Sequence, residues 1–432
     1  MLGKIANFEF RYQLTSPAFF IIFLLFFLFT FAGVALPQVQ IGTGGNVNVN
    51  SPYGLILTIL IMGLFAIIIP TVFLSNVVLR DSANKMDGIL FSTPVTKTDY
   101  LVGRFLGGFA IVILAYLSIP LGFFVGTLMP WLDPELVGPL RPLDYLYVIG
   151  LFGIPNMLLV GMLMFVVANL TRSNMATYIA LVGFFVFYLV SQSFLDQPEF
   201  RSIAALTDPV GATAFDNMTR NWTAFERNAQ LPPISGDILK NRLLWIGVSI
   251  GLMVLNFVTF SFRRTGASIS GRKKTEKTPP QQRFIPTEIT LPAVTREFTA
   301  HTSRRQFFAR TAFEVRSIFF SITFWVLLVL GIALALLNLF NIGEIFGTPI
   351  LPVTRTMVDL LVGGFGFVPF VVVIFYAADL LWRDRGAKMH EIIDASPAPG
   401  WAFLLPKLLA ISLVVIALFA FCLLYTSPSP RD

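Results

Sequence analysis

The stretch that decides the fold is the first long apolar segment, residues 18–36, with the sequence AFFIIFLLFFLFTFAGVAL. It contains no charged residue, and its length is close to the roughly 20 residues that a helix needs to cross the hydrocarbon core of a bilayer. No water is available there, so the backbone must satisfy its own hydrogen bonds, which favours a helix. The segment therefore predicts a transmembrane helix.

Eight further apolar segments of similar length follow along the chain. They are residues 55–78, 102–128, 145–169, 175–194, 243–262, 317–340, 357–381 and 402–424. Of the 432 residues, 55% are hydrophobic and 13% charged, whereas about a quarter are charged in ordinary soluble proteins. This composition excludes a soluble or disordered chain. The predicted fold class is an all-α polytopic membrane protein with about nine transmembrane helices.

Basic residues concentrate in alternate loops, and this sets the predicted orientation. The loop at 37–52 has no Lys or Arg, whereas residues 79–104 hold four and residues 263–316 are densely basic. Cytoplasmic loops of membrane proteins carry an excess of Lys and Arg. We therefore expect a cytoplasmic N-terminus, an external segment at 195–242, and a net charge of +7 that reflects topology and not nucleic-acid binding.

An internal repeat divides the chain. Arg80-Asp81 is followed by a set of residues that recurs, without a gap, 303 positions later after Arg383-Asp384. The first set continues with Lys85, Met86, Ile89, Leu90, Pro94 and Arg104, and the second with Lys388, Met389, Ile392, Ile393, Pro397 and Lys407. A motif that precedes the first span of each unit, Glu9 and Arg11, recurs 305 positions later as Glu314 and Arg316. Six spans lie in the first unit, so the second starts on the same side, as in parallel repeats.

The repeated segment predicts a short amphipathic helix. Met86, Ile89 and Leu90 are spaced to share one helix face, and Pro94 is expected to end the helix because the residue before a proline avoids the α region. One interpretation is a helix lying among lipid headgroups. The other, which the duplication favours, is a docking helix for a cytoplasmic partner. For the Glu9/Arg11 motif, a helix with an arginine reaching phosphate and a contact with that partner both remain open.

Motifs for soluble catalysis are absent from the sequence. It contains no G-x-x-x-x-G-K-[ST], H-E-x-x-H or G-x-S-x-G, so ATP hydrolysis, zinc peptidase and α/β-hydrolase chemistry are not predicted for this chain. Cys422 is the single cysteine, which excludes a Cys-based metal cluster, and His301 and His390 are the only histidines and lie far apart, which leaves little for His-based catalysis or zinc. Ionisable residues are scarce within the spans, which disfavours a proton-coupled transporter.

Four segments in this order carry a family resemblance. They are FEFRYQLTSP, QIGTGGNVNVNSPYG, RDSANKMDGILFSTPVTKTDYLVGRFLGGF and MPWLDPELVGP. The chain resembles, over residues 1–421, the bacterial type-2 (exporter-type) ABC transporter permeases, and more narrowly the subgroup in which tandem permease units precede an aminopeptidase-N-like metallopeptidase domain. The resemblance implies an inner-membrane permease whose partners are ABC-type ATPase subunits. ATP and Mg²⁺ would be bound by those subunits, so no cofactor is expected in this chain.

The resemblance also implies a role for the repeated residues. In that family the segment after the second span contacts the ATPase. By resemblance this role falls on Arg80, Asp81, Lys85, Met86, Pro94 and Arg104, and on Arg383, Asp384, Lys388, Met389, Pro397 and Lys407. The metallopeptidase domain and the second half of the second unit are not found in the sequence.

The predicted organisation has four parts. Residues 1–265 form a six-span permease unit, 266–305 a basic, proline-containing cytoplasmic linker, and 306–421 the first half of a second unit. Residues 422–432, CLLYTSPSPRD, have a back-translation that matches a transposase-based sequencing adapter, so we expect them not to be native sequence. The predicted function is the permease of an ATP-driven exporter of unknown substrate. The alternatives are a membrane anchor for a fused metallopeptidase and a secondary transporter or channel.

Overall fold

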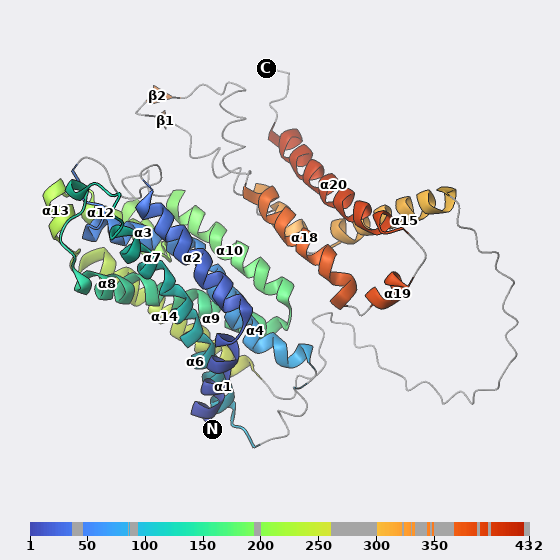
Figure 1. Ribbon diagram of the computed structural model, residues 1–432, viewed down its shortest axis with the longest axis horizontal. Helices are drawn as coiled ribbons and strands as arrows, with labels where there is room; N and C mark the ends of the chain where they lie inside the picture. The colour runs from blue at the N-terminus through green and yellow to red at the C-terminus, as the bar shows by residue number, and fades with distance from the viewer. Residues whose placement is uncertain are drawn as a thin grey trace, which may run out of the picture. The chain divides into compact units, whose positions relative to one another are not determined.

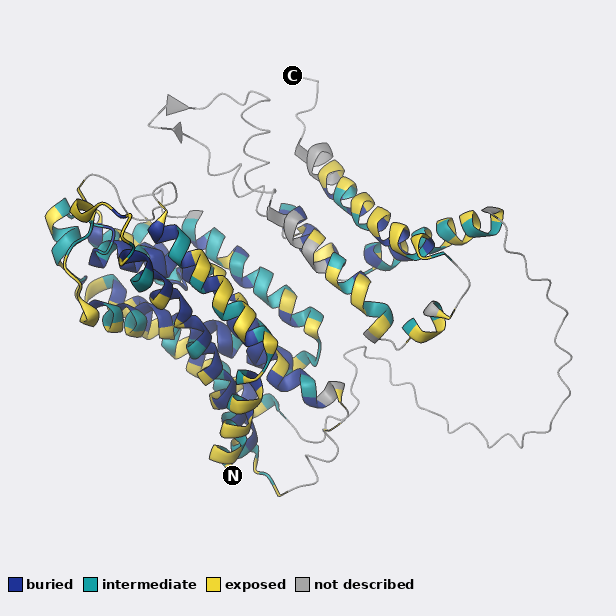
Figure 2. Ribbon diagram, viewed as in Figure 1, coloured by how far each residue is buried: buried dark blue, intermediate teal, exposed yellow. Residues whose placement is uncertain are grey.

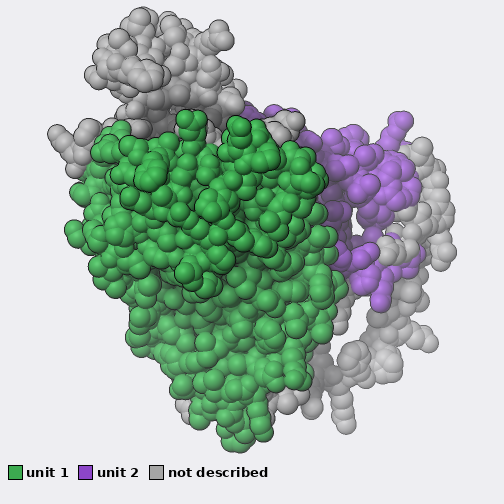
Figure 3. Space-filling view, turned by 60° about the vertical axis from the view of Figure 1, so that its left-hand side comes forward, with its two compact units in different colours: residues 1–267 green, residues 268–432 purple. Residues whose placement is uncertain are grey.

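The computed structural model divides the chain into two units, Met1–Ala267 and Ser268–Asp432, which Figure 3 colours separately. We describe each by itself. The structure describes residues 1–36, 46–84, 86, 94–193, 200–260, 300–321, 324–329, 331–332, 344–345, 348–349, 367–386, 389–395 and 399–426. Most of the predicted linker lies outside these ranges, as do parts of the spans predicted at 317–340 and 357–381.

Unit 1 contains the six predicted spans, if the bent pair α3 and α4 counts as one. They are α2 (Pro17–Ala35), the bent pair α3 (Pro52–Phe65) and α4 (Ile68–Ala83), the pair α6 (Lys97–Tyr116) and α7 (Ser118–Thr127), the run α8 (Pro142–Val148), η2 (Ile149–Gly153) and α9 (Ile154–Thr171), α10 (Asn174–Ser193), and α14 (Gly236–Thr259). With α20 (Trp401–Thr426) the described residues hold six candidate spans, or seven if the bent pair counts as one. This confirms an all-α polytopic membrane protein, and the predicted number of nine awaits the remaining residues.

Prolines explain the breaks within these spans. Pro70, Pro120 and Pro155 each lie in the first turn after a break, where α4, α7 and α9 begin. A proline has no N–H to donate to the preceding turn, so the helix is interrupted just before it. The break before α4 bends that span by 43°, and the break before α9 is the π-helical turn η2.

The two ends of unit 1 differ. The amphipathic helix α1 (Leu2–Leu14) lies at one end, which we call the α1 end, together with the end of α4 and the start of α6 (Figure 1). The opposite end, the cap end, holds η1 (Pro134–Leu136), α11 (Arg201–Thr207), α12 (Ala212–Thr219) and α13 (Ala224–Ala229). The predicted external segment 195–242 is joined there to the segment before α3 by the backbone N–H of Asn48, which donates to Asn228 Oδ1 at 2.8 Å.

The core of unit 1 lies between the spans, and the outer faces of α2 and α14 are apolar and exposed (Figure 2). Phe20, Ile21 and Leu24 on α2 are each more than half exposed. So large an apolar surface is stable only when lipid covers it. Small residues bring the helices close, as at Gly122 of α7, where an added Cβ would lie 2.5 Å from the carbonyl oxygen of Phe27. Such close approach is typical of helix packing in membranes.

Unit 2 consists, in its described part, of α15 (Ala300–Phe319), α18 (Phe367–Gly386), α19 (His390–Asp394) and α20, with two short antiparallel strands, β1 (Glu344–Ile345) and β2 (Thr348–Pro349). Both α15 and α18 pack against α20. By the repeat spacing, α15 corresponds to α1, α18 to α4 and α20 to α6.

Candidate functional site: paired ionic clusters at the span ends

Four charged side chains meet at the α1 end of unit 1, and we call them the first cluster: Glu9, Arg80, Asp81 and Arg104. They come from three helices, α1, α4 and α6. Glu9 pairs with both Arg80 and Arg104. Nη2 of Arg104 also donates to both carboxylate oxygens of Asp81, at 2.9 and 2.7 Å. One guanidinium therefore bridges two carboxylates that are 72 residues apart in the sequence.

The first cluster is almost withdrawn from solvent. Glu9 is 0% exposed, Arg104 6% and Asp81 8%. Burying charges costs several kcal/mol per ion unless each is paired and hydrogen-bonded, and here two carboxylates face two guanidiniums. Each charged group is paired with one of opposite sign, so removing one side chain leaves a buried charge without its partner. The cluster is thus a buried ionic joint between α1, α4 and α6.

Neutral groups complete the first cluster. Tyr100 donates its hydroxyl to Asp81 Oδ2 at 3.1 Å. Gln13, one turn after Glu9 on α1, donates to the carbonyl oxygen of Phe73 on α4 at 3.3 Å. The guanidinium of Arg80 lies 4.0 Å from the ring centroid of Tyr12, close enough for a cation–π contact. These contacts fix the rotamers of the charged residues.

Glycine 107 allows the cluster to form. Helices α1 and α6 cross so closely that a Cβ added at Gly107 would lie 2.4 Å from the carbonyl oxygen of Ala6 and 2.7 Å from Cβ of Glu9. Arg104 lies one turn before Gly107 on α6. The close crossing therefore brings its guanidinium within reach of Glu9.

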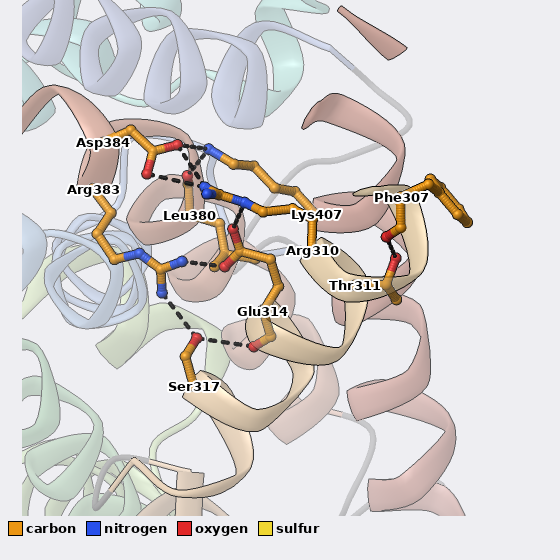
Figure 4. A network of polar contacts seen from close by, with 9 residues as sticks. All are labelled: Phe307, Arg310, Thr311, Glu314, Ser317, Leu380, Arg383, Asp384 and Lys407. Atoms are coloured by element: carbon orange, nitrogen blue, oxygen red, sulfur yellow. Dashed lines mark hydrogen bonds and ion pairs between the residues drawn. The ribbon is translucent and has the colours of Figure 1, made fainter. Parts of the chain in front are cut away.

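Unit 2 contains an equivalent second cluster, which consists of Arg310, Glu314, Arg383, Asp384 and Lys407 (Figure 4). Arg383 pairs with Glu314 as Arg80 pairs with Glu9, and Lys407 Nζ donates to Asp384 Oδ2 at 2.7 Å as Arg104 donates to Asp81. Arg310 has no charged counterpart in unit 1, where Ile5 occupies the position 305 residues earlier. Its Nε lies 2.9 Å from Glu314 Oε1, and its Nη2 donates to both oxygens of Asp384 at 3.1 Å.

The cations of the second cluster lower the pKa of Asp384. Burial raises the pKa of this carboxyl group, but the hydrogen bonds and positive charges of Lys407 and Arg310 outweigh that effect. The pKa of Asp384 therefore lies below its usual value, and its carboxylate is ionised at neutral pH.

Backbone turns beside the clusters repeat as well. The N–H of Met86 donates to the carbonyl oxygen of Asp81 at 2.9 Å, and the N–H of Met389 donates to that of Asp384 at 2.9 Å. Both methionine side chains are about half exposed, at 49% and 46%. Each cluster therefore holds an apolar side chain outward at the end of its helix.

The structure places Arg80 and Asp81 within α4, which continues to Ala83. Arg104 and Tyr100 bind Asp81 there, at the end of the span bundle. Most of the short helix predicted after them, including Ile89 and Leu90, lies outside the described residues, so it stays a prediction in unit 1. In unit 2, α18 likewise runs to Gly386, and a separate five-residue helix, α19, carries Ile392 and Ile393 with Met389 as its N-cap.

The remaining predicted site residues are placed as follows. Arg11 and Arg316 are exposed on α1 and α15, on the side away from Glu9 and Glu314, and Pro94 is exposed ahead of α6. Lys85, Ile89, Leu90, Lys388 and Pro397 lie outside the described residues. Contact with an ATPase stays a prediction for all of them.

A second polar group was missed by sequence analysis. At the cap end, Asn156, Asp208, Asn241 and Arg242, which we call the cap cluster, are at most 8% exposed. Arg242 Nη1 donates to Asn156 Oδ1 at 2.8 Å, and Asn241 Nδ2 donates to the carbonyl oxygen of Asp208 at 2.7 Å. The cap cluster ties α11 and α12 to α9 and α14. Arg242 stands just outside the predicted sixth span, so hydropathy gave no sign of its burial.

Metal chemistry finds no support in the described part of the chain, where no group of three or more His, Cys, Asp or Glu side chains is placed to hold an ion. The polar groups found there pair with one another, so the clusters are suited to joining helices.

The N-terminal part of the chain is similar to a known family of membrane proteins. Residues 4–200 match the family model of the ABC-2 family transporter proteins, which are membrane components of ABC transporters. No curated protein matches the chain. The matched residues include α1, α4 and α6 and hence the whole first cluster. Over residues 4–200, this multi-pass membrane protein is therefore similar to ABC-2 type permeases.

Proposed function

We propose that the chain is the permease subunit of an ATP-driven ABC exporter in the bacterial inner membrane. It would form the substrate pathway and couple to ABC-type ATPase subunits in trans. The observation that carries this proposal is the first cluster, a buried ionic joint between three helices, within the segment that matches ABC-2 family transporter proteins. We place the α1 end in the cytoplasm, because basic loops adjoin it.

Coupling requires that a push at the membrane surface reaches the spans. Met86 projects from the end of α4, five residues after Asp81, and Asp81 is bound to Arg104 on α6. A force on the segment after α4 therefore acts through Asp81 on α6, and through Arg80 and Glu9 on α1. Each of these helices adjoins or is part of a span, so the ionic joint would convert ATPase movement into span movement.

The duplication extends this proposal to two ATPase contacts. The second cluster repeats the ionic joint, and Met389 repeats the outward side chain of Met86. ABC ATPases hydrolyse ATP between two nucleotide-binding subunits, so we infer that one chain offers a docking point to each. The 303-residue repeat also supports the proposed place of the chain in the subgroup with tandem permease units.

The test uses the full chain reconstituted in nanodiscs with the ABC-type ATPase subunit encoded beside its gene. We expect the two to co-elute and the chain to change ATP turnover. Replacing both Met86 and Met389 by Arg should weaken association at least about tenfold, the effect of losing about 1.4 kcal/mol at an interface. Phe225→Arg is the matched control, because Phe225 is 75% exposed at the cap end.

Two results would overturn the proposal. A correctly folded chain that neither binds the ATPase nor alters its turnover would favour the alternative of a membrane anchor. Unchanged association in the Met86/Met389 variant, with the native chain binding well, would move the docking surface away from the span ends.

A further inference from the structure

The two clusters use a guanidinium from different helices for the same task. In unit 1, Arg104 on α6 pairs with Glu9 through Nη1 and with both oxygens of Asp81 through Nη2. In unit 2, Arg310 on α15 forms an ion pair with Glu314, with Nε 2.9 Å from Oε1 but without hydrogen-bond geometry, and its Nη2 donates to both oxygens of Asp384 (Figure 4). In each cluster one planar cation therefore bridges the two carboxylates.

The lysine in unit 2 explains why a second cation is needed. Lys407 corresponds to Arg104, but its one nitrogen donates to the carbonyl oxygen of Leu380 at 2.6 Å and to Asp384 Oδ2 at 2.7 Å. The donors of a lysine all radiate from one nitrogen, whereas those of an arginine are spread over a planar fork that can reach two separate carboxylates. No ion pair between Lys407 and Glu314 occurs among the described residues.

The helix crossings of the two units also differ. Unit 1 has Gly107 where α1 and α6 cross, and even one methyl group there would lie 2.4 Å from Ala6 O. The repeat places Ala410 at this position in unit 2, where it is fully buried. A cation on α15 itself, one turn before Glu314, reaches that carboxylate without spanning the crossing.

We infer that Arg310 is a positioning residue, which supplies in unit 2 the carboxylate bridge that Arg104 supplies in unit 1. The two units then meet the same requirement with different residue pairs. Unit 1 has Ile5 with Arg104, and unit 2 has Arg310 with Lys407. Arg310 was not among the residues predicted from the sequence, because it has no charged counterpart in the repeat. The second cluster thereby carries three cations against two carboxylates, whereas the first carries two of each.

The experiment measures the melting temperature of the full chain in nanodiscs for Arg310→Ile and Arg310→Lys, each alone and combined with Lys407→Arg. We expect Arg310→Ile to lower Tm by roughly 3–8 °C, the shift that losing one or two charge-assisted contacts gives in a unit of this size. Arg310→Lys keeps the charge but cannot bridge, and should lose at least half as much. Adding Lys407→Arg should restore at least half of either loss.

Arg305→Ile is the control, because Arg305 is exposed on the same helix. The reciprocal test in unit 1 is Arg104→Lys, which should lower Tm, and its combination with Ile5→Arg, which should recover part of the loss. If the single variants fail to fold, recovery of folded protein in the double variants is the readout.

An Arg310→Ile variant that melts like Arg305→Ile would overturn the inference. So would an Arg310→Lys variant equal to the native chain, which would show that only charge matters, or double variants that recover nothing. A second readout, ATP turnover with the ATPase bound, should fall for Arg310→Ile and recover with Lys407→Arg. That readout rests on the proposed function, whereas Tm does not, so the two can fail separately.

Discussion

Glu9 is the member of the first cluster whose replacement tests the ionic joint most sharply. Its carboxylate is 0% exposed and pairs with two guanidiniums, those of Arg80 and Arg104. Glu9→Gln keeps the size and shape of the side chain and removes only the charge. Asp81 then remains as the single carboxylate for two largely buried cations.

The size of the effect follows from this burial. Removing one partner of a fully buried ion pair costs about 3–5 kcal/mol, because the other charge stays buried without compensation. The side chains of Arg80 and Arg104 retain 13% and 7% exposure, so we expect the lower end, about 3 kcal/mol. For a unit of this size, about 2–4 °C of Tm per kcal/mol predicts a shift of roughly 6–12 °C.

The assay is thermal unfolding of the full chain in nanodiscs, followed by intrinsic fluorescence. Glu135→Gln is the matched control, since Glu135 is exposed in η1 at the cap end, and its Tm should not change measurably. Adding Arg80→Gln to Glu9→Gln removes the uncompensated cation and should recover part of the loss. If Glu9→Gln melts within about 1 °C of the native chain, the first cluster does not stabilise unit 1 and the reasoning fails.

Three further predictions follow from the same contacts. Gly107→Ala should lower Tm by more than Glu9→Gln does, because the added Cβ would lie 2.4 Å from a carbonyl oxygen of α1. Gly63→Ala is the control in the same thermal scan, because an added Cβ there has no neighbour within 4 Å. Gly211→Ala should destabilise the cap end and expose α11 and α12 to proteolysis, because Gly211 has φ +83 and its Cβ would lie 2.0 Å from Arg242 Nη2; unchanged cleavage would contradict it. The lowered pKa of Asp384 means that its pairs stabilise unit 2 fully above about pH 4 and are lost as pH falls through the lower folded value, so Asp384→Asn should flatten the acid side of a Tm-against-pH curve.

Much of the fold could be predicted from the sequence because the signals are local. Apolar length alone places the six predicted spans of unit 1, and the structure has a candidate span at five of them and the bent pair α3 and α4 at the other. The extent of α4 could not be predicted, because contacts with α1 and α6 carry that helix through Arg80 and Asp81, and such contacts leave no mark on hydropathy.

The candidate site could likewise be predicted only in part. The repeat spacing alone identifies Glu9, Arg80, Asp81 and Arg104 and their counterparts, because duplicated residues stand out in the sequence. Their roles could not be predicted, since an exposed docking contact and a buried ionic joint use the same residue types. Arg310 was missed because it departs from the repeat, and the cap cluster because its polar residues belong to no repeated pattern.

The most direct measurement for the central claim is photocrosslinking in the membrane. A photoreactive amino acid would replace Met86, Met389 or Phe225 in turn, in the full chain assembled with its ATPase subunits. The account predicts ATPase adducts from Met86 and Met389, which project beside the two clusters, and none from Phe225 at the cap end. An intact complex that gives adducts from Phe225, or from neither methionine, would contradict coupling through the α1 end.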